Sequence, residues 1–204
     1  MSRVAILDYG MGNLRSVEKA LERVGARAEV TREPEAIRSA GALVLPGVGA
    51  FPKAMEAVRE LRFDELVRER VEAGVPVLGI CLGMQLLFES STELGGAEGI
   101  GLLRGRVEAL PANGLKLPQI GWNTVSWRAE SELNAGLPDP CAFYHVHSFA
   151  PRPIDHADVV GTAIYGAEFA SVVEWDSLHG VQFHPEKSSS AGLRLLGNFV
   201  RICS

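Results

Sequence analysis

The chain has 204 residues, of which 47% are hydrophobic and 22% are charged, and its formal net charge is −5. This length suits one globular domain with a large buried core, and the composition excludes a disordered chain. No long basic run accompanies the charge, so nothing indicates a surface for nucleic acid or for an anionic membrane. We therefore expect a single domain over residues 1–204 that acts on small neutral or zwitterionic substrates.

The three cysteines, Cys81, Cys141 and Cys203, lie far apart in the chain. An odd, dispersed set argues against a disulfide framework and for a reducing compartment. The opening stretch MSRVAILDYG has neither a long apolar segment nor a small-residue cleavage site, so we expect no signal peptide and no membrane span. These features predict a cytoplasmic protein.

Short apolar runs alternate with helical patterns as far as Ile80. The expected strands cover residues 4–10, 27–32, 42–51 and 75–80. The expected helices cover residues 12–25, with Asn13 as N-cap, 34–40, and one long segment, 52–74. Strands that alternate with helices predict an α/β fold, with a mostly parallel open sheet and helices on both faces.

The pattern changes after Gly101. Apolar runs rich in β-branched and aromatic residues alternate with loops that contain proline and glycine. The expected strands here cover residues 101–110, 122–127, 143–149 and 158–166. This spacing is typical of antiparallel strands, so we expect an antiparallel β-rich section inside the domain. The end of the chain returns to a strand, residues 180–186, and then to a helix, residues 190–203.

The stretch VPVLGICLG holds the first candidate for chemistry, Cys81. It lies between Gly79 and Gly83, in the small-x-nucleophile-x-small spacing of a nucleophile elbow. Such a turn lifts the nucleophile above the sheet and needs glycines because neighbouring backbone approaches closely. A position at the start of a helix also favours the thiolate. The alternative is a buried structural cysteine.

A thiolate needs a base, and the motif GVQFHPEK offers one. Pro185 favours an extended His184 and has its own φ fixed, so His184 and Glu186 project to the same side. A carboxylate beside an imidazole can fix its tautomer and stabilise the imidazolium, as the third member of a triad does. The alternative is a surface turn. His145 and His147 could be two metal ligands, but no third and fourth ligand with zinc spacing accompanies them.

Several motifs carry a resemblance to a known family. GICLGMQLLFE with a distant FHPEK resembles the class I (triad) glutamine amidotransferases. DYGMGNLRSV, LPGVGAF, IGWN and HVHSF together resemble the glutaminase subunits of imidazole glycerol phosphate synthase, in that family's order from Ile6 to Phe199. The resemblance implies a flavodoxin-like open sheet and glutamine hydrolysis without a cofactor or metal. It also implies Cys81 as nucleophile, His184 as general base and acid, and Glu186 as its orienting carboxylate.

Attack on an amide creates an oxyanion, which needs preorganised backbone donors. The N–H of Leu82 can supply one, and the PGVG loop, through Val48 and Gly49, can supply another. Gln85 lies four residues after Cys81, hence on the same helix face, where the alternative is a solvated residue. The resemblance gives the amino-acid end of glutamine a larger set of contacts: Gly47, Gln85, Glu93, His147, Ser148 and Phe149.

The resemblance also implies a partner, the (β/α)8-barrel cyclase subunit, in a heterodimer that makes imidazole glycerol phosphate and an aminoimidazole carboxamide ribotide for histidine synthesis. Ammonia would be protonated and lost in bulk water, which a docked partner prevents. The candidates for the docking face are Asn13, Trp122, Asn123 and Lys187. The alternatives are a core aromatic for Trp122 and a solvated side chain for Lys187.

Some features keep other functions in view. Gln119, His145 and Ser189 depart from the family, where a histidine, an aromatic residue and a glutamine are frequent. A glutaminase subunit of another amidotransferase, or a cysteine γ-glutamyl hydrolase or peptidase, could use the same triad. A non-catalytic binding subunit would be expected to lose triad members, and all three are present.

Overall fold

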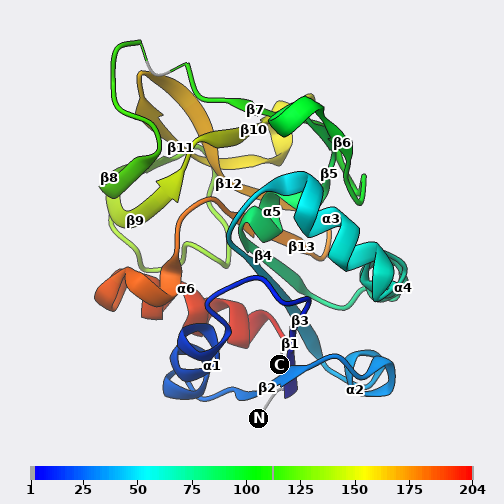
Figure 1. Cartoon of the computed structure of the whole chain (residues 1–204). Coiled ribbons are helices and arrows are strands. Elements are labelled where there is room, and N and C mark those ends of the chain that lie inside the picture. Colours follow the sequence, from blue (N-terminus) through cyan, green and yellow to red (C-terminus); the bar gives the residue numbers. More distant parts are fainter. Residues whose placement is uncertain (1–2, 112, 204) are drawn as a thin grey trace.

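The computed structural model describes residues 3–111 and 113–203 and is built around one large mixed sheet (Figure 1). Within these residues, nine strands form that sheet in the order β2-β1-β3-β4-β13-β12-β11-β8-β9. Their bounds are Arg3–Leu7 for β1, Arg27–Thr31 for β2, Ala42–Gly47 for β3, Val77–Cys81 for β4, Gln119–Trp127 for β8, Cys141–His147 for β9, Val159–Tyr165 for β11, Ala167–Trp175 for β12 and Leu178–Val181 for β13. A smaller sheet, in the order β10-β7-β5-β6, contains Phe88–Ser91 (β5), Ala97–Glu98 (β6), Leu103–Ala109 (β7) and Phe149–Pro153 (β10).

The first half of the large sheet is parallel. Strands β2, β1, β3, β4 and β13 all run in the same direction. Their order is the 2-1-3-4-5 order of flavodoxin-like folds, with β13 in the fifth place. Strands β12, β11, β8 and β9 then extend the sheet by antiparallel pairing. The predicted open α/β sheet with an antiparallel section is therefore confirmed.

Helices cover both faces of the parallel half (Figure 1). Their bounds are Leu14–Arg23 for α1, Pro34–Arg38 for α2, Phe51–Glu60 for α3, Phe63–Glu72 for α4, Leu82–Leu86 for α5 and Ser189–Ile202 for α6. Alternate residues of β1 face opposite sides, as the period of a strand requires: Val4 and Ile6 pack in a core with α1 and α6, and Ala5 and Leu7 in a second core with α2 to α5. Among the described residues, no helix is long and apolar enough to cross a membrane.

The single helix expected over residues 52–74 is wrong. Helix α3 ends at Glu60 and α4 begins at Phe63, and Arg62 between them has a left-handed φ of 54°. The apolar pattern nevertheless continues because both helices pack their buried residues into the same core. The spacing of apolar residues therefore predicts the buried face of both helices correctly, but it does not predict the turn between them.

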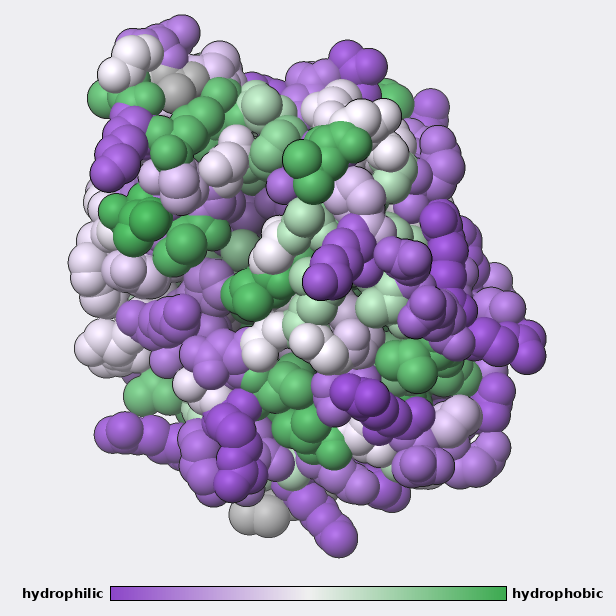
Figure 2. Space-filling model, viewed as in Figure 1, coloured by the Kyte–Doolittle hydropathy of each residue, from purple (hydrophilic) through white to green (hydrophobic). Residues whose placement is uncertain are grey.

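The antiparallel section also differs from the expected one. Strand β12 lies outside the segments expected as strands, although its middle residues are buried. The segment expected as one strand over residues 143–149 divides at Ser148, and its two parts, β9 and β10, join different sheets. Figure 2 shows hydrophobic residues at the surface over β8 and β9. Two large exposed side chains of β8 are Ile120 and Trp122.

Three strand ends bring the candidate residues together. Gly47 at the end of β3 pairs with Cys81 at the end of β4, and Val181 at the end of β13 pairs with Ile80. Because these strands are parallel, their carboxyl ends meet at one edge of the sheet, where open α/β sheets bind ligands. The chain that leaves β13 reaches His184 within three residues.

Candidate active site

Cys81 stands in a strained turn between β4 and α5. Its backbone has φ 54° and ψ −111°, a left-handed value that a residue with a side chain rarely adopts. The flanking glycines permit close packing: a Cβ on Gly83 would lie 1.7 Å from the Leu45 carbonyl oxygen, and one on Gly79 would lie 2.7 Å from the backbone of Met84. The geometry is therefore that of the nucleophile elbow predicted from the sequence.

His184 and Glu186 form a buried pair. His184 is extended (φ −101°, ψ 95°), and Glu186 lies in the short 3₁₀ turn Pro185–Lys187 that follows. The Nδ1 atom of His184 lies 2.9 Å from Oε1 of Glu186, and these side chains are only 3% and 1% exposed. The surface turn considered as an alternative is therefore excluded, and Nε2 of the same ring is left to face the thiol.

The main chain of His184 is fixed from two sides. Its N–H donates to the Tyr144 carbonyl on β9 at 2.9 Å. Its own carbonyl accepts a hydrogen bond from the Ser188 hydroxyl at 2.7 Å, and that hydroxyl also accepts from the Tyr144 N–H. Tyr144 and Ser188 thus hold the imidazole in place, although the sequence did not single them out.

Electrostatics favour a protonated His184. Burial alone would lower the pKa of its imidazole, but hydrogen bonds with Cys81 and Glu186, together with their negative charge, outweigh burial and raise that pKa to about 10. The two neighbouring histidines behave in the opposite way. Burial lowers the pKa of His145 to about 3 and that of His147 to about 4, so both rings are neutral at physiological pH.

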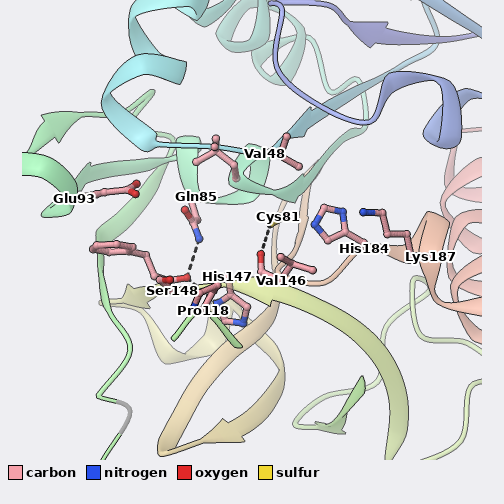
Figure 3. Close-up of a pocket in the computed structure, with 13 residues that line it drawn as sticks. Val48, Cys81, Gln85, Glu93, Pro118, Val146, His147, Ser148, His184 and Lys187 are labelled. Carbon is pink, nitrogen blue, oxygen red and sulfur yellow. Dashed lines mark hydrogen bonds between the residues drawn. The ribbon is translucent and has the colours of Figure 1, made fainter. Parts of the chain in front are cut away.

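A cavity of about 240 Å³ opens at the thiol (Figure 3). The predicted residues that line it are Val48, Gly49, Cys81, Leu82, Gln85, Glu93, His147, Ser148, Phe149, His184 and Lys187. Gly47 lies outside this lining, because it faces the Tyr9 hydroxyl and the Leu82 side chain. Pro118 and Val146 line the cavity although the sequence did not indicate them. His156 and His179 lie outside this lining.

The PGVG loop passes over the cavity beside Cys81. Its Gly49 has a φ of 111°, and a Cβ at this position would lie 2.6 Å from Cε of Met11. The loop is held from behind by Tyr9, whose buried hydroxyl donates to the Pro46 carbonyl at 2.5 Å. Leu82 opens α5, and the N–H groups of a first helical turn have no partner within the helix. The PGVG loop and the first turn of α5 therefore both border the cavity at the thiol.

Gln85 and Glu93 lie at the far end of the cavity from His184 (Figure 3). Gln85 is buried, which excludes the solvated residue considered above, and its Nε2 donates to the Phe149 carbonyl at 2.9 Å. One oxygen of Glu93 accepts from the Phe51 N–H at the start of α3, 2.8 Å away. The His147 ring packs against Phe169, and its Nδ1 lies 2.8 Å from the Phe149 carbonyl.

The structure separates the four docking candidates. Trp122 is 57% exposed, so it is not a core aromatic, and Lys187 is exposed beside His184 (Figure 3). The Asn123 amide already donates to the Ile164 carbonyl at 3.0 Å, which ties it to β11. Asn13 occupies the N-cap position of α1, but the predicted capping is wrong in part: its carbonyl accepts from Val17, and its side chain makes no capping hydrogen bond.

The His145 ring explains one departure from the family pattern. Its Nδ1 lies 3.1 Å from the Phe143 carbonyl and its Nε2 lies 3.0 Å from the Ser171 hydroxyl. Both ring nitrogens are therefore engaged in hydrogen bonds within the core. This arrangement lets a polar ring take the place of an aromatic one, and it leaves neither nitrogen turned to the cavity.

The chain matches the family model "Glutamine amidotransferase class-I" over residues 5–203. It belongs to the class-I glutamine amidotransferase family. This amidotransferase is 50% identical to "Imidazole glycerol phosphate synthase subunit HisH" of Moorella thermoacetica, over 98% of the chain and 94% of that relative. The protein of the same name from Symbiobacterium thermophilum is also 50% identical, over 99% of the chain and 95% of the relative.

Solved structures agree on the fold of this amidotransferase. The structure of PurLQS from Thermotoga maritima matches with a TM-score of 0.80 over all of both chains, at 19% identity. A crystal structure of a glutamine amidotransferase matches with a TM-score of 0.75 over 98% of both chains, at 24% identity. These matches confirm the fold alone. The family model confirms the family predicted from the sequence, and the curated relatives carry the name of the predicted synthase subunit.

Proposed function

We propose that Cys81, His184 and Glu186 are the catalytic triad with which this chain hydrolyses glutamine to glutamate and ammonia. One observation carries the proposal: a cysteine in a strained elbow lies beside a buried His–Glu pair, at a cavity that polar residues line. A nucleophile, a base oriented by a carboxylate, and backbone donors beside them are the elements that acyl transfer requires.

The reaction uses the high pKa of His184. His184 takes the proton of the Cys81 thiol, and the resulting thiolate attacks the side-chain amide carbon of glutamine. The imidazolium then gives its proton to the departing ammonia as the C–N bond breaks. His184, now neutral, takes a proton from water, which hydrolyses the γ-glutamyl thioester. Glu186 holds the ring in the required tautomer at Nδ1.

The oxyanion of each tetrahedral intermediate needs donors beside the sulfur. We assign them to the N–H of Leu82 and to the peptide of Val48 and Gly49, which line the same side of the cavity. A single donor of this kind is worth roughly two to three orders of magnitude in rate. Two glycines flank Val48, so the peptides on either side can rotate, and the loop can aim either an N–H or a carbonyl at the oxyanion.

The distal end of the cavity suits the zwitterionic end of glutamine. One oxygen of Glu93 accepts from Phe51, which leaves the other to accept from an ammonium group. Gln85 uses its N–H groups inside the protein, so its Oε1 can accept as well. His147, Ser148 and Phe149 line the same cavity, whereas Gly47, a residue of the PGVG loop, lies outside the lining. At about 240 Å³ the cavity is below the roughly 300–1,000 Å³ of common ligand pockets, which favours an amino acid over a peptide.

The curated relatives are subunits of imidazole glycerol phosphate synthase, and we propose that this chain also forms a heterodimer with a (β/α)8-barrel cyclase that consumes its ammonia in histidine biosynthesis. Exposed apolar and basic side chains near the cavity support a docking face: Trp122, Ile120, Val48 and Lys187. Asn13 and Asn123 stay predictions from the sequence, and Asn123 points to the opposite side of β8 from Trp122. The cytoplasmic location expected for such an enzyme stays a prediction.

The direct test compares two buried cysteines. Cys81→Ala should abolish glutamine-dependent synthesis by the complex but leave synthesis from added ammonium intact, because the acceptor site lies on the other chain. Cys141→Ala, a matched change at another buried thiol, should leave both activities unchanged. The measurement is product formation from either nitrogen source with the barrel subunit present. Wild-type glutamine hydrolysis by Cys81→Ala would refute the assignment of the nucleophile.

A further inference from the structure

A buried amide outside the triad contacts the proposed nucleophile. Gln182 follows β13, two residues before His184, and its side chain is fully buried. Its Nε2 lies 3.7 Å from Sγ of Cys81, and its Oε1 accepts a hydrogen bond from Nε2 of Gln85 at 3.0 Å. Because a buried amide costs free energy unless its polar atoms are satisfied, a glutamine in this apolar segment calls for an explanation.

The orientation of this amide follows from its neighbours. The Phe149 carbonyl can only accept, so the Gln85 atom 2.9 Å away must be Nε2. The same Nε2 reaches Gln182, and the atom that receives its second N–H must be Oε1. The remaining end of the Gln182 amide is then Nε2, and it faces the sulfur. A chain of hydrogen bonds therefore fixes a donor, rather than an acceptor, beside Cys81.

We propose that Gln182 is a positioning residue for the nucleophile, whose amide N–H donates to Sγ of Cys81 and stabilises the thiolate over the thiol. A hydrogen bond to the charged form of a group favours that form, and bonds to ions are stronger than those between neutral groups. The inference rests on the proposed function, since it takes Cys81 as the nucleophile. It adds to the triad a donor that acts on the sulfur from within the protein.

Two other polar groups lie beside the sulfur, the Val146 carbonyl and the His184 ring. The Val146 carbonyl lies 3.6 Å from Sγ and can only accept, so it favours the thiol, which has a proton to donate. His184 favours the thiolate as an imidazolium. Gln182 opposes Val146 from inside the protein, where water does not compete for the hydrogen bond.

The same chain of hydrogen bonds reaches the substrate. Gln85 lines the cavity where the amino-acid end of glutamine is proposed to bind, and it holds Oε1 of Gln182. Gln182 therefore connects the sulfur of Cys81 to a residue of the proposed substrate site.

The test separates the two hydrogen bonds of Gln182. Gln182→Glu keeps an oxygen for Gln85 but places a carboxylate oxygen, not an N–H, at the sulfur. The rate at which iodoacetamide alkylates Cys81 is measured by mass spectrometry at a series of pH values. At neutral pH we expect this rate to fall by about tenfold or more, since a hydrogen bond to a charged group is worth at least that. The kcat for glutamine hydrolysis should fall similarly, whereas KM should stay within about twofold.

Matched variants keep this test decisive. Asn198→Asp makes the same kind of change at a buried amide in α6 that serves the Leu133 and Ala135 carbonyls, so it should lower the melting temperature without changing the pH profile of alkylation. Gln182→Met, which has no donor and no charge, carries the measurement if the glutamate variant does not fold. Wild-type alkylation profiles in the folded Gln182 variants would overturn the inference. Failure of the proposed function is seen separately, as hydrolysis retained by Cys81→Ala.

Discussion

At the scale of single residues, the site combines backbone strain with a buried charge pair. The left-handed backbone of Cys81 costs of order 1–3 kcal/mol and persists only because the surrounding strands hold it. Cys81 and Glu186 raise the pKa of His184, whose side chain is only 3% exposed. Both features cost stability, and both are explained by the proposed chemistry.

His184 is the residue whose loss should separate catalysis from folding. His184→Asn should lower the turnover of glutamine by at least about two orders of magnitude, because general acid and base catalysis is lost. His179→Asn is a matched control, since His179 is also buried and also lies near a carboxylate, Glu174 at 3.7 Å, but outside the cavity. Steady-state kinetics measures all three proteins. Equal losses in both variants would point to a folding effect and remove the support for a unique base.

At the scale of elements, β9 carries two neutral buried histidines, His145 and His147. Burial lowers their folded-state pKa to about 3 and about 4, below the unfolded value of about 6.5. The stability that each contributes is therefore fully present above pH 6.5 and is lost as the pH falls toward its folded pKa. The slope is about 1.4 kcal/mol per pH unit for each histidine.

The variant His145→Phe should reduce this sensitivity to acid. Its free energy of unfolding should fall less steeply between pH 6.5 and 4.5 than that of the wild type, by about 1.4 kcal/mol per pH unit. Urea unfolding at a series of pH values gives the slope. Ser171→Ala removes the hydrogen-bond partner of His145 but keeps the ring, so it should lower stability while the slope stays near that of the wild type. An unchanged slope in His145→Phe would contradict the assigned neutral state.

The PGVG loop is the second element with a specific expectation. Gly49→Ala should lower glutamine hydrolysis by about two orders of magnitude, because a side chain is strained at φ 111° and relief of this strain turns the peptide that is proposed to serve the oxyanion. Gly25→Ala is the control: Gly25 has φ 94°, so similar backbone strain appears there outside the cavity. Kinetics and thermal melting are compared. If both variants lose only stability, the loop does not supply the donor.

At the scale of the whole molecule, the cavity lies at one end of the parallel strands, and exposed tryptophans lie both near it and at the opposite end. Trp122 lies on β8, in the strand that begins next to Pro118 of the cavity. Trp175 is also exposed, but it pairs with Leu178, which in turn pairs with Val77 at the start of β4, the end far from Cys81. The chain thus offers two exposed tryptophans at opposite ends of its strands.

Trp122→Ser should weaken binding of the barrel subunit by about tenfold or more, because an exposed tryptophan is the kind of side chain that anchors an interface. Calorimetric titration measures this affinity, and glutamine hydrolysis with and without the barrel measures the stimulation that we expect from docking. Trp175→Ser should bind like the wild type. Equal weakening in the two variants would place the docking face elsewhere.

The proposed triad could be recognised in the sequence because its spacing is local. Gly79, Cys81 and Gly83 fall within one turn, and His184 and Glu186 lie on either side of a proline, so each half needs only short-range geometry. Gln182 was missed, although a polar residue inside the apolar run GVQF was the available signal. Its partners, Gln85 and Cys81, are 97 and 101 positions away, and no local pattern reports such contacts.

The fold shows the same division. The alternation of strands and helices predicted the parallel sheet, since hydrophobic periodicity records which faces are buried. The break between α3 and α4 was missed because neither proline nor glycine marks it, and Arg62 takes a left-handed conformation that its type disfavours. Strand β12, hidden between β13 and β11, has buried residues in succession instead of a clear alternation.

The place of β13 has a consequence for synthesis on the ribosome. This strand lies in the middle of the sheet between β4 and β12, yet it is the last strand to be made. A nascent chain that has already produced Cys81 therefore lacks both the strand that flanks it and the proposed base, His184. We expect closure of the sheet, a slow long-range step, to be also the step that completes the proposed active site.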